Sequence, residues 1–194
     1  MIFNVQELNN IILHRRSILP NMYTGEKVDD ILIQQMIANA NWAPTHKKTE
    51  PWRFVVFKEN GLKILAEFQS ELYKKVTSGL GSFKEEKYID LKLKPLKASH
   101  VIAICMKRDL RESLPEIEEI EAVACAVQNM YLTAAALGIG CYWGTGGITY
   151  MEEAKKFFEL EAGDKLLGFF YVGVPKKWPE GKRSPVEDKI RWIQ

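Results

Sequence analysis

The first fifty residues carry two amphipathic patterns. Apolar residues recur at helical spacing over residues 3–14 and again over residues 28–41, so a helix is predicted in each range. Arg15 and Arg16 directly follow the first helix. Pro44 ends the second, because the residue before a proline disfavours helical geometry.

Four later runs are strand-like. Residues 53–58 combine aromatic and β-branched side chains, and the run is too short for a stable helix. Residues 101–106 are continuously apolar, which is typical of a strand buried on both faces. A short strand is predicted at residues 141–143, and the longest buried strand at residues 166–174.

Two segments between these strands are helical. Residues 62–76 predict a regular helix, whereas residues 77–99 contain Gly79, Gly81 and many charges in a broken apolar pattern. We interpret residues 77–99 as a mobile helical excursion that could act as a lid. The acidic stretch from residue 112 to residue 121 is interpreted as a solvated helix start, where acids suit the helix dipole.

The helix predicted over residues 122–137 has almost no polar face. Such a helix must be covered on all sides, by the core or by a partner subunit. Thr149 and Glu152 form a capping-box pattern that predicts a further helix to about residue 158, and a last helix is expected to carry Trp192. The order of helices and strands predicts an α+β fold with helices on both sides of a small sheet, and residues 1–194 are expected to form one domain.

Composition excludes several function classes. Hydrophobic residues make up 46% of the chain and the net charge is only +2, so nothing demands a nucleic acid or an anionic membrane as partner. No apolar run approaches the roughly 20 residues needed to cross a bilayer. The first seven residues lack the basic and apolar regions of a signal peptide, so a cytoplasmic location is expected.

Candidate catalytic and metal-binding side chains are few. The three cysteines lie far apart in apolar contexts and are expected to be buried, which disfavours disulfides and a zinc site. His14, His46 and His100 have no metal-ligand spacing, and no G-x-S-x-G elbow is present. No metal site and no catalytic acid or base is therefore predicted, although a triad assembled by the fold stays open.

Two basic clusters could bind a phosphate. Arg15, Arg16 and Ser17 place two guanidinium forks and a hydroxyl together, and Lys182 and Arg183 form a second cluster that could converge on the same phosphate. A second pattern is glycine-rich: the segment 144–147 could let a flat ring approach its backbone, or it could be a plain tight turn. The polar loop 43–52 leads into an aromatic residue and a strand. Together these features indicate a phosphorylated, flat aromatic cofactor.

In their order along nearly the whole chain, these motifs resemble the nitroreductase family of FMN-dependent oxidoreductases, and most closely its compact NAD(P)H nitroreductase branch. The motifs are Arg15-Arg16-Ser17, Ala43-Pro44-Thr45-His46-Lys47, Pro51-Trp52-Arg53-Phe54, the small-residue helix 122–137 with Gly138-Ile139-Gly140 and Trp143, the strand 167–174, and Lys182-Arg183-Ser184-Pro185-Val186-Glu187.

The resemblance implies a nitroreductase-like fold with a small, mostly antiparallel central sheet, and an intertwined homodimer with FMN at the interface. It implies that Arg15, Arg16, Ser17 and Arg183 bind the phosphate and ribityl end of FMN, with Lys182 as a possible helper. The segment Trp143, Gly144 and Thr145 would lie against the flavin ring. Trp42 and His46 would approach FMN from the opposite subunit, and NADH or NADPH would enter near residues 133–138.

The activity implied is a ping-pong cycle in which FMN takes a hydride from NAD(P)H and then reduces a nitroaromatic, a quinone or a similar small electrophile. Alternatives are a non-catalytic flavin-binding or interaction protein, or a flavoenzyme of this fold that reduces enones, dehydrogenates or dehalogenates. Two positions depart from the family: Glu50 stands where glutamine is usual, and Trp42 where close relatives carry arginine. Trp42 could stack near the ring or pack in the core. His46 is expected to hydrogen-bond the flavin, with loop capping as the alternative.

Overall fold

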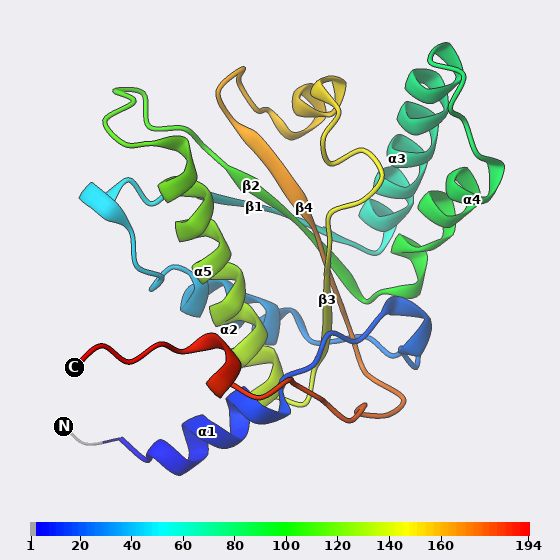
Figure 1. The fold of residues 1–194 in the computed structure, drawn as a ribbon. Coiled ribbons are helices and arrows are strands. Elements are labelled where there is room, and N and C mark those ends of the chain that lie inside the picture. Colours follow the sequence, from blue (N-terminus) through cyan, green and yellow to red (C-terminus); the bar gives the residue numbers. More distant parts are fainter. Residues whose placement is uncertain (1–2) are drawn as a thin grey trace.

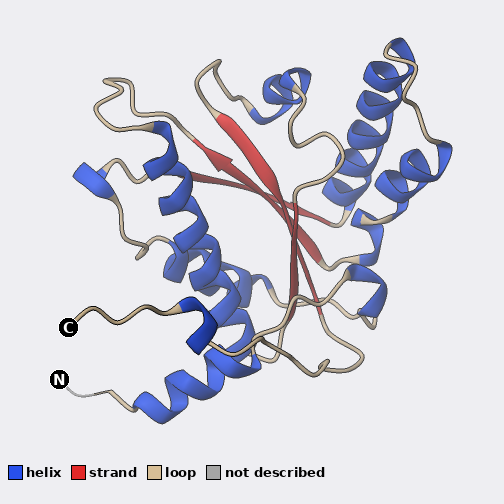
Figure 2. Ribbon diagram, in the orientation of Figure 1, coloured by secondary structure: helices blue, strands red, loops and turns tan. Residues whose placement is uncertain are grey.

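The computed structural model describes residues 3–194 and contains helices and strands in the predicted order (Figures 1 and 2). Its α-helices are α1 (Val5–His14), α2 (Asp30–Ala40), α3 (Asn60–Gly79), α4 (Glu85–Leu93) and α5 (Glu116–Ala136). Its strands are β1 (Trp52–Lys58), β2 (His100–Met106), β3 (Gly140–Gly144) and β4 (Lys165–Gly173). Short 3₁₀ turns are η1 (Pro20–Met22), η2 (His46–Lys48), η3 (Pro95–Lys97), η4 (Glu152–Phe158) and η5 (Glu187–Lys189). No helix within residues 3–194 is long and apolar enough to span a membrane.

The sheet has the order β1-β2-β4-β3, and every neighbouring pair of strands is antiparallel. It separates α1, α2 and α5 on one side from α3, α4 and η4 on the other (Figure 1). Strand β2 is buried along its whole length because alternate side chains enter the two cores: Ile102 and Ile104 pack with α2 and α5, and Val101 and Ala103 pack with α3. The predicted α+β fold with a small antiparallel sheet and helices on both sides is confirmed.

Helix α5 begins in the predicted acidic stretch, but that stretch is not uniformly solvated. Glu119 is fully buried, where it pairs with Arg108 and accepts the backbone N–H of Asp109 at 2.9 Å. A buried carboxylate needs such partners to offset the loss of hydration. The pair therefore fixes the loop after β2 to the first turn of α5.

Three local predictions are corrected. The Thr149 hydroxyl donates to the Gly146 carbonyl (3.1 Å) and caps no helix; the following turn η4 is a 3₁₀ helix that starts after Met151. Trp192 lies outside any helix, since η5 ends at Lys189. Of the cysteines, Cys105 and Cys141 are buried, but Cys125 is exposed on α5. Burial raises the pKa of the Cys105 thiol to about 12, which keeps it protonated and unreactive.

Residues 77–99, which we interpreted as a mobile lid, are packed against the body of the protein. Helix α4 lies beside α3 (Figure 1), and its Leu91 side chain is buried. The Tyr88 hydroxyl donates to a Glu71 carboxylate oxygen of α3 at 2.6 Å. The broken apolar pattern therefore reflects a short helix with one buried contact face.

An ion pair beside a histidine holds the start of α2 to the sheet and makes stability depend on pH. Hydrogen bonds from Lys58 and from His100 Nε2 (3.0 Å) lower the pKa of Asp30. Because the unfolded chain binds this proton more tightly, the stabilisation is present above about pH 4 and is lost as pH falls through the folded-state pKa. Asp30→Asn should lower the thermal unfolding midpoint at pH 7 and change it less at pH 3, with Asp188→Asn in the exposed tail as control. Equal calorimetric shifts at both pH values would contradict this linkage.

Candidate functional site

The structure brings the two basic clusters together. Arg15, Arg16, Lys182 and Arg183 line one cavity of about 430 Å³. The rest of the lining comes from Ile12, Leu13, Gln128 and Gly181. Four cationic side chains around one cavity make a strong attraction for a dianion such as a phosphate monoester.

The two neighbouring arginines have different surroundings. The Arg16 guanidinium donates to the carbonyls of Leu13 (2.6 Å), Arg15 (2.8 Å) and Pro179 (3.1 Å), so it ties the C-terminal segment to the end of α1. An added Cβ at Gly181 would overlap the Arg16 guanidinium, so the tail backbone lies directly against this side chain. The Arg15 guanidinium instead lies 5.1 Å from the centre of the Tyr131 ring, and no carboxylate within residues 3–194 pairs with it. Arg15 is therefore the more available phosphate donor.

A chain of contacts links the cationic cavity to the end of β3. The Tyr131 hydroxyl, below Arg15, accepts the backbone N–H of Trp143 at 2.7 Å. Burial raises the pKa of Tyr131, although a hydrogen bond with Ser17 opposes this shift, so the phenol keeps its proton near neutral pH. The backbone of Ser17 also forms an isolated parallel β-bridge with Cys141 of β3. The Arg15–Ser17 segment thus lies beside the strand that leads to the glycine-rich loop.

The loop after β3 combines exposed and tightly packed positions. The Trp143 indole N–H donates to the Leu167 carbonyl at 3.0 Å, and Thr145 is exposed directly after buried Gly144. Gly147 has φ +75°, and an added Cβ would lie 2.6 Å from the Leu91 side chain of α4. The Leu91 side chain of α4 therefore packs directly against this loop.

Trp42 and His46 lie away from the cationic cavity. Trp42 is 86% exposed, so the alternative that it packs in the core is wrong. His46 is in η2, and its Nδ1 lies 2.6 Å from a carboxylate oxygen of Glu118 on α5. Neither side chain lines the cavity formed by Arg15 and Arg183 of the same chain.

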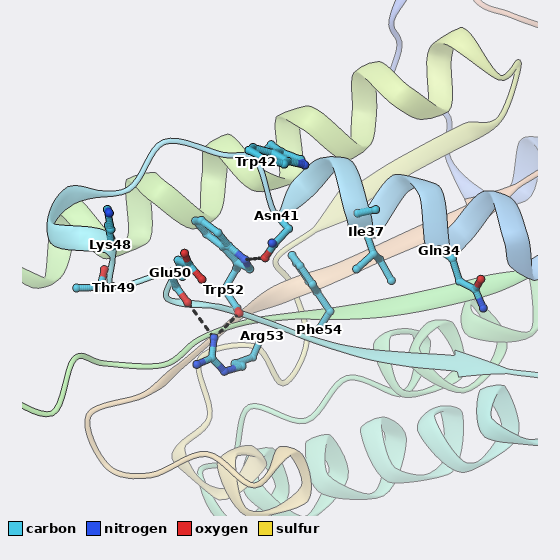
Figure 3. A pocket seen from close by; sticks show the side chains of 11 residues that line it. Gln34, Ile37, Asn41, Trp42, Lys48, Thr49, Glu50, Trp52, Arg53 and Phe54 are labelled. Carbon is cyan, nitrogen blue, oxygen red and sulfur yellow. Dashed lines mark hydrogen bonds between the residues drawn. The ribbon is translucent and has the colours of Figure 1, made fainter.

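A second cavity, of about 800 Å³, is larger than the cationic one. It lies between α2 and β1, with Trp42 at its rim (Figure 3). The Trp52 indole donates to Asn41 (2.9 Å), and Arg53 donates to the carbonyls of Glu50 and Trp52. The charged residues that line this cavity are Lys48, Glu50 and Arg53, so it carries less positive charge than the cavity of Arg15, Arg16, Lys182 and Arg183.

A serine–histidine–aspartate chain exists but does not form a nucleophilic site. Ser99 Oγ lies 3.0 Å from His100 Nδ1, and His100 Nε2 lies 3.0 Å from Asp30. Ser99 Oγ also accepts the Val28 backbone N–H (2.7 Å), and it does not line the neighbouring cavity that Asp30 and His100 reach. In the described part of the chain, no group of three or more metal-ligating side chains could hold a metal ion.

Comparison with known proteins assigns the chain to a family. The family model described as the Nitroreductase family matches residues 12–174, well over half of the sequence. The chain belongs to the nitroreductase family. This membership confirms the resemblance inferred from the ordered motifs.

Individual relatives agree with this nitroreductase assignment. The Bacillus subtilis (strain 168) protein named "Putative NAD(P)H nitroreductase YfhC" is 30% identical over 185 residues, which cover 94% of this chain and 92% of the relative. The crystal structure of a nitroreductase-like family protein from Bacillus cereus superposes with a TM-score of 0.80 at 27% identity over the whole of both chains. The FMN-dependent nitroreductase NfnB from Mycobacterium smegmatis, solved in complex with NADPH, shares the fold with a TM-score of 0.73 at 16% identity, over 98% of this chain and 99% of NfnB.

Sequence reasoning missed several residues around the candidate cavity and around His46. Tyr131 was part of the apolar helix, and nothing in its spacing indicated a contact with Arg15. Gly181 was a signal that could have been used, because a glycine directly before Lys182 permits close approach of another chain segment. Glu118 belonged to a charge run and gave no individual signal.

Proposed function

We propose that this protein is an FMN-dependent oxidoreductase that uses NADH or NADPH to reduce nitroaromatics, quinones or similar small electrophiles. The observation that carries the proposal is the cationic cavity of Arg15, Arg16, Lys182 and Arg183 beside the end of β3. Family membership supports it, as do a relative named for NAD(P)H and a structural neighbour named for FMN and NADPH.

The residues present fit FMN. Arg15 and Arg183 would hold its phosphate, with Arg16 organising the cavity wall and Ser17 near the ribityl chain. Trp143, Gly144 and Thr145 would lie against the ring. FMN supplies the hydride-accepting chemistry when bound, so the protein's tasks are to bind it, orient it and keep a ring face open. We name no catalytic acid or base.

We further propose that residues 1–194 act as one FMN-binding domain within a homodimer. Helix α1 buries none of its own residues, and its exposed apolar side chains include Leu8 and Leu13. Cys125 on α5 and Trp192 in the tail are also exposed. Exposed apolar side chains that gather on one helix are typical of an interface, and a second chain would cover them in the proposed dimer.

In such a dimer Trp42 and His46 would complete the FMN site of the other chain, which accounts for their separation from Arg15. The nicotinamide would approach over the open ring face, near residues 133–138. We place the reaction in the cytoplasm, where both nicotinamide cofactors are supplied. The acceptor would bind at the same ring face after the nicotinamide leaves, as a ping-pong cycle requires.

The purified protein is expected to be yellow, dimeric and bleached anaerobically by NADH or NADPH. Absorbance at the flavin bands, with light scattering for mass, checks all three properties. A colourless protein that takes up no added FMN would refute the proposal. Bound FMN without bleaching would favour a non-catalytic flavin protein, and bleaching without turnover of nitroaromatics or quinones would favour another flavin chemistry.

A further inference from the structure

His46 belongs to a loop that is held in place by several contacts. Lys47 and Glu50 both have positive φ angles, +49° and +44°, which are unusual for residues with side chains. The Lys47 ammonium donates to the Ser113 carbonyl at 2.8 Å, and the Thr45 hydroxyl accepts the Glu50 N–H at 3.2 Å. The loop backbone is therefore fixed independently of the His46 side chain.

The imidazole of His46 is oriented by a separate contact. Its Nδ1 lies 2.6 Å from Glu118 Oε2, while the His46 side chain is 57% exposed and that of Glu118 is 37% exposed. Glu118 lies in the first turn of α5, where the helix dipole stabilises a carboxylate. One ring nitrogen is thus occupied, and the rest of the ring remains accessible.

The other acids of this helix start have different partners. Glu119 is buried against Arg108, and Glu116 pairs with Lys165 at 3.3 Å. Glu118 is the acid directed at His46. The first turn of α5 therefore carries three carboxylates with three separate contacts.

The chemistry of the pair determines where the His46 proton lies. A carboxylate only accepts hydrogen bonds, so Nδ1 must carry the proton in the contact with Glu118. This leaves Nε2 as the ring nitrogen that faces outward. Carboxylates that fix ring orientation and tautomer in this way are common behind functional histidines.

We propose that Glu118 is a positioning residue for His46: it fixes the imidazole plane and holds the proton at Nδ1, so that Nε2 is presented to the flavin in the other subunit's site. The inference rests on the proposed function. It goes further by assigning a role to Glu118, which acts through His46 and does not itself contact FMN.

The first test reads the proton position directly, in flavin-free protein. The sequence has only three histidines, so nitrogen NMR signals of the imidazoles can be assigned with His46→Ala. In the wild type, His46 is expected to carry its proton at Nδ1, and Glu118→Ala should remove that preference while Glu121→Ala on the same helix leaves it. An unchanged tautomer in Glu118→Ala would overturn the inference without bearing on FMN.

The second test is a double-mutant cycle on FMN affinity, measured by quenching of flavin fluorescence. Glu118→Ala should weaken binding about three- to tenfold, as expected for one lost hydrogen bond, and should add nothing in a His46→Ala background. Glu118→Gln keeps an acceptor oxygen and should stay within about twofold of the wild type. The visible spectrum of bound FMN in Glu118→Ala should match that in His46→Ala.

Other outcomes separate this inference from the function. If Lys47→Ala weakens binding as much as Glu118→Ala, or if Glu118→Ala has the same effect without His46, the pair only fastens the loop and the inference is overturned. If Glu118→Ala binds FMN like the wild type, the inference alone is overturned. If the folded wild type binds no FMN, the proposed function fails and the inference fails with it.

Discussion

Replacing Arg15 by alanine is expected to weaken FMN binding about 10- to 150-fold. A hydrogen bond to a charged group contributes about 1.5–3 kcal/mol, which corresponds to that range of affinity. Arg15 is the sensitive position because its guanidinium faces the cationic cavity over Tyr131, whereas the Arg16 guanidinium is already engaged by three backbone carbonyls. Fluorescence titration of flavin-free protein measures the change.

Matched variants distinguish the loss of a direct phosphate contact from the loss of overall positive charge. Arg111→Ala removes an exposed arginine far along the chain and should leave FMN affinity unchanged. Arg15→Lys should recover part of the loss, because lysine keeps the charge but not the fork of donors. The effect of Arg15→Ala on riboflavin, which lacks the phosphate, should be small. An equal loss for FMN and riboflavin would show that Arg15 does not contact the phosphate.

The layers of the fold were predictable because burial leaves a periodic trace in the sequence. The side chains of β2 pack into the cores on both faces of the sheet, so residues 101–106 are continuously apolar and predict a buried strand. In α2, apolar residues recur at helical spacing because one face of the helix covers the sheet. Its predicted and observed bounds agree closely. Each of these elements is specified by its own residues.

Features that depend on distant partners were not predictable. Glu119 is buried because Arg108 pairs with it. In the sequence, Glu119 is one acid of a charged run, and such a run predicts a solvated surface. The spacing of Thr149 and Glu152 predicts a helix cap. The Thr149 hydroxyl instead donates to the carbonyl of Gly146, because the chain turns there. The broken pattern of residues 77–99 indicates a mobile excursion because the single buried leucine of α4 leaves little periodicity.

The candidate site was predictable in composition but not in assembly. The sequence indicates two basic clusters, and the tail contacts at Arg16 and Gly181 bring them into one cavity. No local pattern could reveal that Tyr131 connects Arg15 to the end of β3. The separation of Trp42 from this cavity is likewise a property of the fold, and it is what motivates a site built from two chains.

Gly168→Ala is expected to destabilise the protein by about 2–4 kcal/mol, as substitutions that combine backbone strain with a close clash do. Gly168 has φ +119° in the middle of β4, opposite a register shift at Ile104 and Cys105 of β2. An added Cβ would lie 2.5 Å from the Gly144 carbonyl oxygen and 2.9 Å from the Trp143 indole nitrogen. The clash is with backbone, which cannot rotate away as a side chain could.

The same clash is directed at the end of β3, so any Gly168→Ala protein that folds should also bind FMN more weakly. Urea unfolding followed by tryptophan fluorescence gives the stability change, and flavin titration in the folded range gives the affinity. Gly79→Ala is the matched control: it lies at the end of α3 with no atom within 4 Å of an added Cβ, and should change stability by no more than about 1 kcal/mol. If Gly168→Ala were as stable as Gly79→Ala, the backbone at this register shift would have to relax easily, and β4 could not hold β3 and its glycine-rich loop rigidly.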